Sequence, residues 1–288
     1  MFVYLNDNVV PEKEAVVSVY DHGYLYGDGV YETMRAYSGV VFKLSRHIER
    51  LRRSASMLQL RLPSDLVITD AVHKTLESNK LSDAYIRITV SRGKGPIGLD
   101  PGLCPQPTFV VIAEQFREYP DACYTQGVKL IVANTRRNLA TAINPMIKSL
   151  NFLNNILAKV EAKGKGAYEA VMLNVEGFVA EGTVCNIFFF KNDVLCTPSP
   201  AAGILDGITR ELVIGLAKES GLAVDEGLWR PEDMYAASEI FITNTTSEIM
   251  PVSMLDERTY KVGERTASLR ALYRKYVADY IRDSNKSS

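Results

Sequence analysis

Residues 143–151 read Ile-Asn-Pro-Met-Ile-Lys-Ser-Leu-Asn, and this stretch holds the lysine around which the rest of the chain can be arranged, Lys148. Pro145 disfavours helix for the residue before it. Apolar side chains then recur at helical spacing from Leu150 to Val160, until Gly164 ends the pattern. The stretch predicts an extended segment that gives way to a helix, with Lys148 at the junction. Rigid placement of this kind suits a covalent catalyst, although a solvated surface charge is the commoner role of a single lysine.

The length and composition limit the classes of protein to consider. The 288 residues exceed one typical domain, so two domains are expected. Hydrophobic residues make up 47% and charged residues 23%, as in ordinary globular proteins. A net charge of −1 argues against nucleic acid as a partner. No apolar run is long enough to span a membrane, and the N-terminus lacks the pattern of a signal peptide.

The cysteines and histidines do not suggest a metal site. Four cysteines lie apart without C-x-x-C spacing, which argues against structural zinc and favours a reducing, cytoplasmic location. The three histidines, His22, His47 and His73, also lack metal-site spacing. Surface or capping roles are expected for them.

Three glycines lie between residues 21 and 29, as in a phosphate-binding loop. Such a loop must open a helix, because the helix N-terminus carries the phosphate. Here the following residues alternate with period two, which predicts a strand over residues 30–37. The glycines are therefore expected to form a tight turn, after short strands at residues 2–5 and 15–19.

Two later stretches of the first half contain candidate binding residues. Ser45 is expected to cap a helix with an apolar stripe and an arginine-rich polar face that includes Arg50. A second helix is expected over residues 64–79. Residues 84–92 alternate cleanly, which predicts a strand with Tyr85 and Arg87 on one face. A guanidinium there could bind a carboxylate, or the face could simply be exposed.

The second half offers three further candidate positions. Glu181 lies in a turn beside a glycine, where backbone can approach a ligand closely. Gly207-Ile208-Thr209 begins an expected helix, whose N-terminus is a ready anion site or a plain cap. Residues 244–247 read Asn-Thr-Thr-Ser after an apolar strand and offer a second phosphate-binding turn.

Taken together, these stretches resemble one family over nearly the whole chain. They are DHGYLYGDGVYE (21–32), HIERL (47–51), YIR (85–87), IKSLNFLNNILAK (147–159), EAVMLNVEGFVAEGTVCNIF (169–188), GITRE (207–211) and ITNTTSEIMPV (242–252). Their order and spacing resemble the class IV, or fold type IV, pyridoxal-phosphate aminotransferases.

The resemblance implies a fold and a role for each matching residue. The implied α/β (α+β) fold has a smaller N-terminal domain (1–118), a linker (119–127) and a larger cofactor-binding domain with a pseudo-barrel sheet (128–288), with pyridoxal 5'-phosphate between the domains. Lys148 would be the Schiff-base lysine, Glu181 would hydrogen-bond the pyridine nitrogen, and Arg50 would bind the phosphate. The other implied cofactor contacts are Ile208, Thr209, Asn244 and Thr245. The implied substrate-pocket residues are Tyr31, Thr33, Arg35, Tyr85, Arg87 and Thr246. Members are homodimers or larger, and a loop of the partner completes the pocket.

The implied reaction is ping-pong amino transfer from an amino acid to a 2-oxo acid such as 2-oxoglutarate, with Lys148 as the base. Tyr85-Ile86-Arg87 and Arg35 resemble the branched-chain L-amino acid type. Three alternatives stay open: an aminodeoxychorismate lyase that eliminates pyruvate, a D-amino acid or amine transaminase, and a non-catalytic relative. The D-amino acid type has an arginine–histidine pair without counterpart in residues 95–99.

Three positions depart from the branched-chain pattern. Thr33 replaces a glycine and resembles the lyase group, Phe152 replaces a tyrosine that contacts the cofactor's phenolic oxygen, and Asn244 replaces a glycine or serine.

Overall fold

The computed structural model describes residues 1–286, and the chain divides into two compact units. The first unit contains residues 1–117, 147–151 and the described end of the chain from Tyr280; the second contains 118–146 and 152–279. The segment 119–127, expected as a linker, belongs to the second unit and includes helix α4 (Ala122–Thr125). The lysine segment folds with the first unit, although in the sequence it lies between two segments of the second unit.

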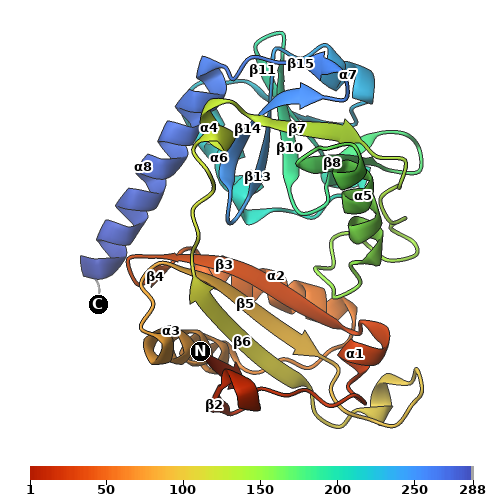
Figure 1. Cartoon of the computed structure of the whole chain (residues 1–288), viewed down its shortest axis with the longest axis vertical. Helices are drawn as coiled ribbons and strands as arrows, with labels where there is room; N and C mark the ends of the chain where they lie inside the picture. The colour runs from red at the N-terminus through yellow and green to blue at the C-terminus, as the bar shows by residue number, and fades with distance from the viewer. Residues whose placement is uncertain (287–288) are drawn as a thin grey trace. The chain divides into compact units, whose positions relative to one another are not determined.

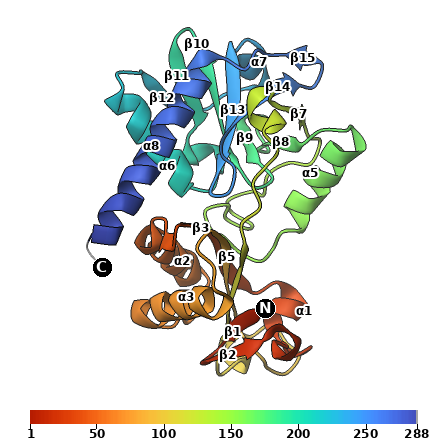
Figure 2. The same cartoon turned by 60° about the vertical axis from the view of Figure 1, so that its left-hand side comes forward.

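The first unit is an antiparallel sheet covered by two helices (Figure 1). The strand order is β2-β1-β6-β5-β3-β4. The strands are β1 (Phe2–Leu5), β2 (Asn8–Pro11), β3 (Gly29–Tyr37), β4 (Val40–Val41), β5 (Ala84–Ser91) and β6 (Thr108–Gln115). Helices α2 (Leu44–Met57) and α3 (Asp65–Asn79) pack on one face and form a single hydrophobic core with the strands (Figure 2).

Strands β3 and β5 show the alternation that the sequence predicts. Val30, Met34, Ile86 and Ile88 are fully buried in the core with α2 and α3. Because successive side chains of a strand point to opposite faces, the odd-numbered residues of both strands lie on the other face of the sheet. This second face carries the expected substrate-pocket residues of the first unit.

The N-terminal region differs from the expectation in three places. Residues 22–26 form a helix, α1 (His22–Tyr26), where a turn was expected; Asp21 caps it, and Gly27 ends it with a φ of 69°. Residues 15–19 form no strand, since the partner of β1 is β2 at Asn8–Pro11. Helix α2 begins at Leu44, and the residue before it, Lys43, has a φ of 52° and makes no side-chain cap. Short turns depend on such local bonds, which hydrophobic periodicity does not report.

The second unit is built on a curled sheet of order β12-β11-β10-β13-β14-β7-β8-β9, to which β15 is added beside β14 (Figure 1). The strands are β7 (Val128–Val132), β8 (Glu169–Leu173), β9 (Val179–Gly182), β10 (Asn186–Lys191), β11 (Val194–Pro198), β12 (Val224–Gly227), β13 (Glu239–Asn244), β14 (Glu248–Leu255) and β15 (Arg258–Thr259). The helices are α4, α5 (Leu153–Gly164), α6 (Ile208–Glu219), α7 (Pro231–Tyr235) and α8 (Glu264–Lys286), whose last described residues belong to the first unit. The mixed α/β fold expected from the sequence is confirmed.

Helix α5 carries its apolar stripe on its exposed side. Ala158 and Ala162 are fully buried against the sheet, whereas Leu153 is 69% exposed and Val160 is 61% exposed. The large apolar residues of α5 therefore face away from the core of their own unit. The periodicity was correct for a helix, but it did not reveal what covers the stripe.

In the part of the chain that the structure describes, no helix has both the length and the hydropathy needed to cross a membrane.

Candidate active site

Main-chain hydrogen bonds hold Lys148 at the edge of β3. The amide of Tyr31 donates to the carbonyl of Lys148 at 3.0 Å, in an antiparallel bridge beside the start of β3. On its other side the amide of Lys148 donates to Ser54 Oγ on α2 at 3.1 Å. Lys148 therefore does not lie at a strand-to-helix junction as expected, because α5 begins only at Leu153. Its rigidity comes from β3 and α2 instead.

The side chain of Lys148 meets the ring of Tyr31. Lys148 Nζ lies 3.4 Å from the Tyr31 hydroxyl and 4.4 Å from the ring centroid. The guanidinium of Arg87 on β5 also lies over this ring, 4.1 Å from the centroid. Burial raises the pKa of the Tyr31 phenol, so Tyr31 stays protonated and neutral at physiological pH. The structure thus brings together Lys148, Tyr31 and Arg87.

Arg35 takes a different place on the same face of the sheet. Its guanidinium is sandwiched between the rings of Tyr37 and Phe116, at 4.2 Å and 3.6 Å from their centroids. Thr33 pairs with Arg87 across β3 and β5. The next pair along the same face is Arg35 with Tyr85. Arg35 is therefore packed by aromatic rings, whereas the half-buried Thr33, Tyr85 and Arg87 are more accessible.

Arg50 lies on the buried face of α2 and not on its polar face as expected. Its Nε and Nη2 atoms donate to the two oxygens of Glu32 at 2.7 Å and 2.8 Å. His47, expected at the surface, is also buried, with Nδ1 at 2.8 Å from Glu32 Oε2. Burial alone would raise the pKa of the Glu32 carboxyl, but Arg50 and His47 outweigh it and hold that pKa well below its usual range. Glu32 is an anion, and it fixes the plane of the Arg50 guanidinium.

Because His47 is buried, we expect the free energy of unfolding to fall at mildly acidic pH. Burial lowers the pKa of the His47 imidazole despite the neighbouring Glu32. Below about pH 6.5, the usual pKa of histidine, the unfolded chain takes up a proton that the folded chain does not. We expect the free energy of unfolding of His47→Gln, measured with urea, to change less steeply with pH between 7 and 5.5 than that of the wild type. The expected difference in slope is about 1 kcal/mol per pH unit. The exposed His73→Gln is the control; equal slopes in wild type and His47→Gln would refute the assignment.

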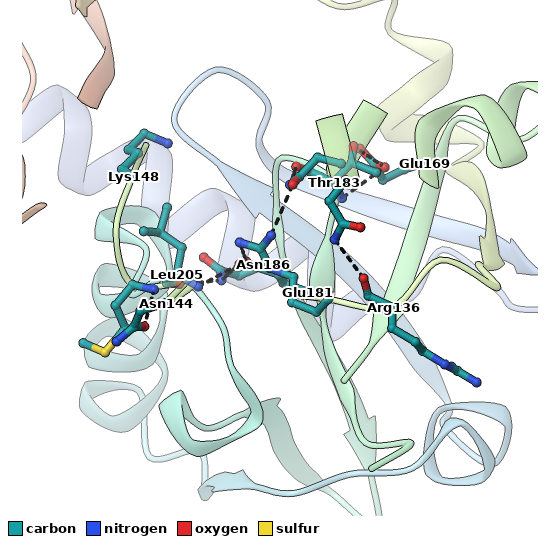
Figure 3. A network of polar contacts seen from close by, with 12 residues as sticks. Arg136, Asn144, Lys148, Glu169, Glu181, Thr183, Asn186 and Leu205 are labelled. Atoms are coloured by element: carbon teal, nitrogen blue, oxygen red, sulfur yellow. Dashed lines mark hydrogen bonds and ion pairs between the residues drawn. The ribbon is translucent and has the colours of Figure 1, made fainter. Parts of the chain in front are cut away.

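In the second unit, donors surround Glu181 of β9 at both oxygens (Figure 3). Arg137 donates to Oε1 through Nε and Nη2, at 2.9 Å and 2.8 Å. Asn186 Nδ2 and the amide of Leu205 donate to Oε2 at 3.2 Å and 3.0 Å. Donors of this number hold a carboxylate ionised and fix its orientation. Asn155 of α5 bonds to both sides of this pair: its Oδ1 accepts from Arg137 Nη1 at 3.2 Å, and its Nδ2 donates to the carbonyl of Thr183 at 2.6 Å.

Two turns of the second unit hold the residues that were expected to contact a phosphate. Gly207 precedes Ile208 and Thr209 at the start of α6 and, among the described residues, provides no side-chain cap. A Cβ at Gly207 would lie 2.0 Å from Asn186 Oδ1, so only glycine fits beside this asparagine. The amide groups of the first turn of α6 therefore suit an anion.

Asn244 organises the second of these turns from within. Its Oδ1 accepts the amide and the hydroxyl of both Thr246 and Ser247, at 2.7 to 3.1 Å. The Thr246 hydroxyl also lies 3.0 Å from Tyr119 Oη. The hydroxyls of Thr246 and Ser247 thus serve the turn, and Thr245 is the residue of the run whose side chain takes no part in this set of bonds.

Several polar residues that support these groups were not expected from the sequence. They are Glu32, His47, Ser54, Arg137, Asn155 and Asn186. On α2 a signal was available, because His47 and Ser54 fall within the apolar stripe of Ile48 and Leu51, where polar residues are costly unless paired.

Comparison with known proteins gives a consistent result. The family model described as Amino-transferase class IV matches residues 29–255. The chain is 47% identical over 278 residues to a putative branched-chain-amino-acid aminotransferase of Methanocaldococcus jannaschii, with 95% of this chain and 96% of the relative covered. It is 35% identical over 286 residues to an aminodeoxychorismate lyase of Bacillus subtilis, with 98% and 96% covered.

Among solved structures, the branched-chain aminotransferase of the thermophilic archaeon Thermoproteus uzoniensis, determined with norvaline, has a TM-score of 0.90 at 38% identity. The alignment covers 96% of this chain and 94% of that chain. Both the family model and the structural likeness extend across the two units, and they confirm the resemblance in the sequence. The chain belongs to the class IV aminotransferase family.

Proposed function

We propose that the protein is a pyridoxal-phosphate-dependent aminotransferase that moves the amino group of a branched-chain L-amino acid to a 2-oxo acid such as 2-oxoglutarate. The observation that carries the proposal is the lysine amine fixed beside Tyr31 and Arg87 by main-chain bonds on both sides of Lys148. The names of the relatives from M. jannaschii and T. uzoniensis support the branched-chain assignment. A further branched-chain amino acid aminotransferase, solved with pyridoxamine 5'-phosphate, has a TM-score of 0.91 at 32% identity and supports the cofactor.

The residues of each unit fit the chemical groups of this cofactor. In the first unit, Lys148 offers an amine for the aldehyde, and Arg50 offers a guanidinium for the phosphate. In the second unit, the ionised Glu181 suits a protonated ring nitrogen. The amides of Ile208 and Thr209 and the Thr245 hydroxyl suit phosphate oxygens, while Asn244 shapes the turn that presents Thr245.

The chain's own residues then have distinct tasks. When bound, pyridoxal phosphate supplies an electron sink for the electrons left at the substrate Cα. Lys148 Nζ would hold the cofactor at its aldehyde group, and the free amine would move the proton from the substrate Cα as the general base. Glu181 keeps the proton on the ring nitrogen, because its carboxylate is held ionised by four donors. Amino donor and acceptor bind in turn, so ping-pong kinetics are expected.

Arg87 is the residue we assign to a substrate carboxylate. Within residues 1–286 its one hydrogen bond is from Nε to Thr89 Oγ1, at 3.2 Å, so both terminal nitrogens can bind a carboxylate bidentately. Tyr31, Thr33, Tyr85 and Thr246 are proposed to line the pocket. Arg35 is proposed to shape it from the aromatic sandwich in which it lies.

The visible absorbance of the purified protein tests this proposal. Loaded with pyridoxal phosphate, it should lose its yellow colour on addition of L-leucine and regain it with 2-oxoglutarate. Loss of colour with D-alanine or 1-phenylethylamine, but not with L-leucine, would indicate a D-amino acid or amine transaminase instead. A protein that takes up no cofactor would refute the proposal.

A second candidate is an aminodeoxychorismate lyase, because Thr33 places a hydroxyl opposite Arg87 where branched-chain enzymes have a glycine. The relative from B. subtilis carries this name. Release of pyruvate from aminodeoxychorismate, without amino exchange between L-leucine and 2-oxoglutarate, would favour the lyase. Amino exchange without pyruvate release would exclude it.

We further propose a homodimer whose interface includes the exposed stripe of α5. Its large apolar residues are Leu153, Ile156, Leu157 and Val160, each between 50% and 69% exposed. Of the two lysines of α5, Lys159 is paired with the carbonyl of Tyr168 and with Glu169, and Lys163 lies at the C-terminal end of the helix, so an antiparallel pair of α5 helices keeps the two copies of Lys163 apart. Leu157→Asp should lower the mass measured by sedimentation to that of one chain. Val175→Asp, at a site 59% exposed, should not; unchanged masses for both would refute the interface.

A cytoplasmic location is proposed from the cysteines. All four are free thiols, and burial raises the pKa of Cys196 to about 11. Thiols that are unpaired in the folded chain suit a reducing compartment. Recovery of the native protein in a cell membrane or extracellular fraction would contradict this location.

A further inference from the structure

Helix α2 carries a line of buried polar residues that all bond outside the helix. His47, Arg50 and Ser54 follow one another at positions i, i+3 and i+7, on the face that also buries Leu51. Ser54 is 0% exposed and Arg50 is 6% exposed. Polar groups at such depth are costly unless they are paired, and here each of them is paired with β3 or with the lysine segment.

One end of this line holds Arg50. Glu32 of β3 accepts from both Nε and Nη2 of the guanidinium, and His47 binds the same carboxylate one turn earlier on α2. A bidentate pair fixes the guanidinium plane as well as its position. The arginine is therefore locked to the strand before any phosphate arrives.

The other end holds Lys148 through its main chain. Ser54 Oγ accepts the Lys148 amide at 3.1 Å, and the Lys148 carbonyl accepts the amide of Tyr31, the residue before Glu32. The bonds form a closed ring, from Lys148 through β3 to Arg50, along α2 to Ser54 and back to Lys148. Ser54 lies four residues after Arg50, a rise of about 6 Å along the helix.

We propose that α2 acts as a rigid spacer between Arg50 and Lys148, in which Glu32 positions the phosphate-binding group and Ser54 positions the amine. The inference deepens the proposed function and rests on the cofactor assigned there. Neither residue touches the substrate, so both are positioning residues. Each acts on a different end of the cofactor.

The two ends give different signatures in cofactor binding. Pyridoxal phosphate can join Lys148 Nζ through its aldehyde, with loss of one water, whereas pyridoxamine phosphate has no aldehyde and binds by its ring and phosphate alone. A misplaced Lys148 therefore weakens the binding of pyridoxal phosphate only. A misplaced Arg50 weakens the binding of both compounds to the same extent.

The experiment measures the dissociation constants of pyridoxal phosphate and pyridoxamine phosphate for the apo-protein, by fluorescence titration. We expect Ser54→Ala to raise the dissociation constant of pyridoxal phosphate by about tenfold, the effect of one lost hydrogen bond. The dissociation constant of pyridoxamine phosphate should not change. We expect Glu32→Gln to weaken both by a similar factor. Ser56→Ala, on the exposed side of α2, is the control and should change neither.

The outcomes separate this inference from the proposed function. If Ser54→Ala weakens both compounds equally, or neither, the spacer is refuted, and so it is if Glu32→Gln weakens pyridoxal phosphate alone. Ser54→Ala removes only a hydroxyl, so it tests the inference even if Glu32→Gln does not fold. A wild-type protein that binds neither compound would refute the proposed function itself.

Discussion

Lys148→Ala is expected to abolish amino transfer, with a fall in rate of about 10⁴-fold for the loss of the general base. The variant should keep its fold, because the bonds that hold position 148 come from the main chain and not from the amine. It should still bind pyridoxal phosphate, without the visible band of a lysine-linked cofactor. The measurement is exchange between L-leucine and 2-oxoglutarate, together with the absorbance spectrum.

Lys163→Ala is the matched control, since this lysine is exposed near the end of α5. It should keep the wild-type rate and spectrum. A Lys148→Ala variant that retained more than a tenth of the wild-type rate would show that another group performs the proton transfer.

Arg137→Met is expected to cost about 3 to 5 kcal/mol of stability, the range for breaking a buried ion pair from one side. Arg137 is 9% exposed and donates three hydrogen bonds, two to Glu181 and one to Asn155. Methionine keeps much of the length and leaves the Glu181 charge uncompensated. Urea unfolding should show the loss as a lower midpoint, and any folded variant should transfer amino groups more slowly, because Glu181 is no longer held.

The neighbouring residue gives the control for this change. Arg136 is exposed, and within residues 1–286 its carbonyl accepts a hydrogen bond from Asn154 while its side chain makes none, so Arg136→Met should leave stability within about 0.5 kcal/mol. Adding Glu181→Gln to Arg137→Met removes the stranded charge, so the double variant should lose less than the sum of the two single losses. Strictly additive losses would contradict a direct pair.

The regular elements of the fold could be predicted where periodicity was strong and local. Residues 84–91 alternate and form β5, and Ser64 caps α3 at the expected boundary. The helix at residues 22–26 was missed, because it depends on a single cap by Asp21 and a left-handed Gly27. The helical spacing of the α5 stripe was predicted, but its exposure was not, because periodicity identifies an apolar face without identifying its neighbour.

The principal residues of the candidate site were proposed from the sequence, whereas the residues that hold them were not. Lys148, Arg50 and Glu181 could be proposed from motifs along the chain. Their supports come from distant positions: Glu32 lies 18 residues before Arg50, Arg137 lies 44 before Glu181, and Ser54 lies 94 before Lys148. A single sequence carries no signal for such pairs, because either partner alone resembles an ordinary polar residue.

The docking of residues 147–151 on β3 also fixes the order in which the chain can become functional. Lys148 meets Tyr31 across a sequence separation of 117 residues, and the second unit's first segment is synthesised between them. Contacts of such separation form late, because the closure of a long loop must come first. During synthesis on the ribosome, the main-chain groups at the edge of β3 near residues 29–31 are therefore unpaired and can bond to a strand of another chain. Docking of the lysine segment then pairs this edge of β3 through the bridge between Val30 and Ser149.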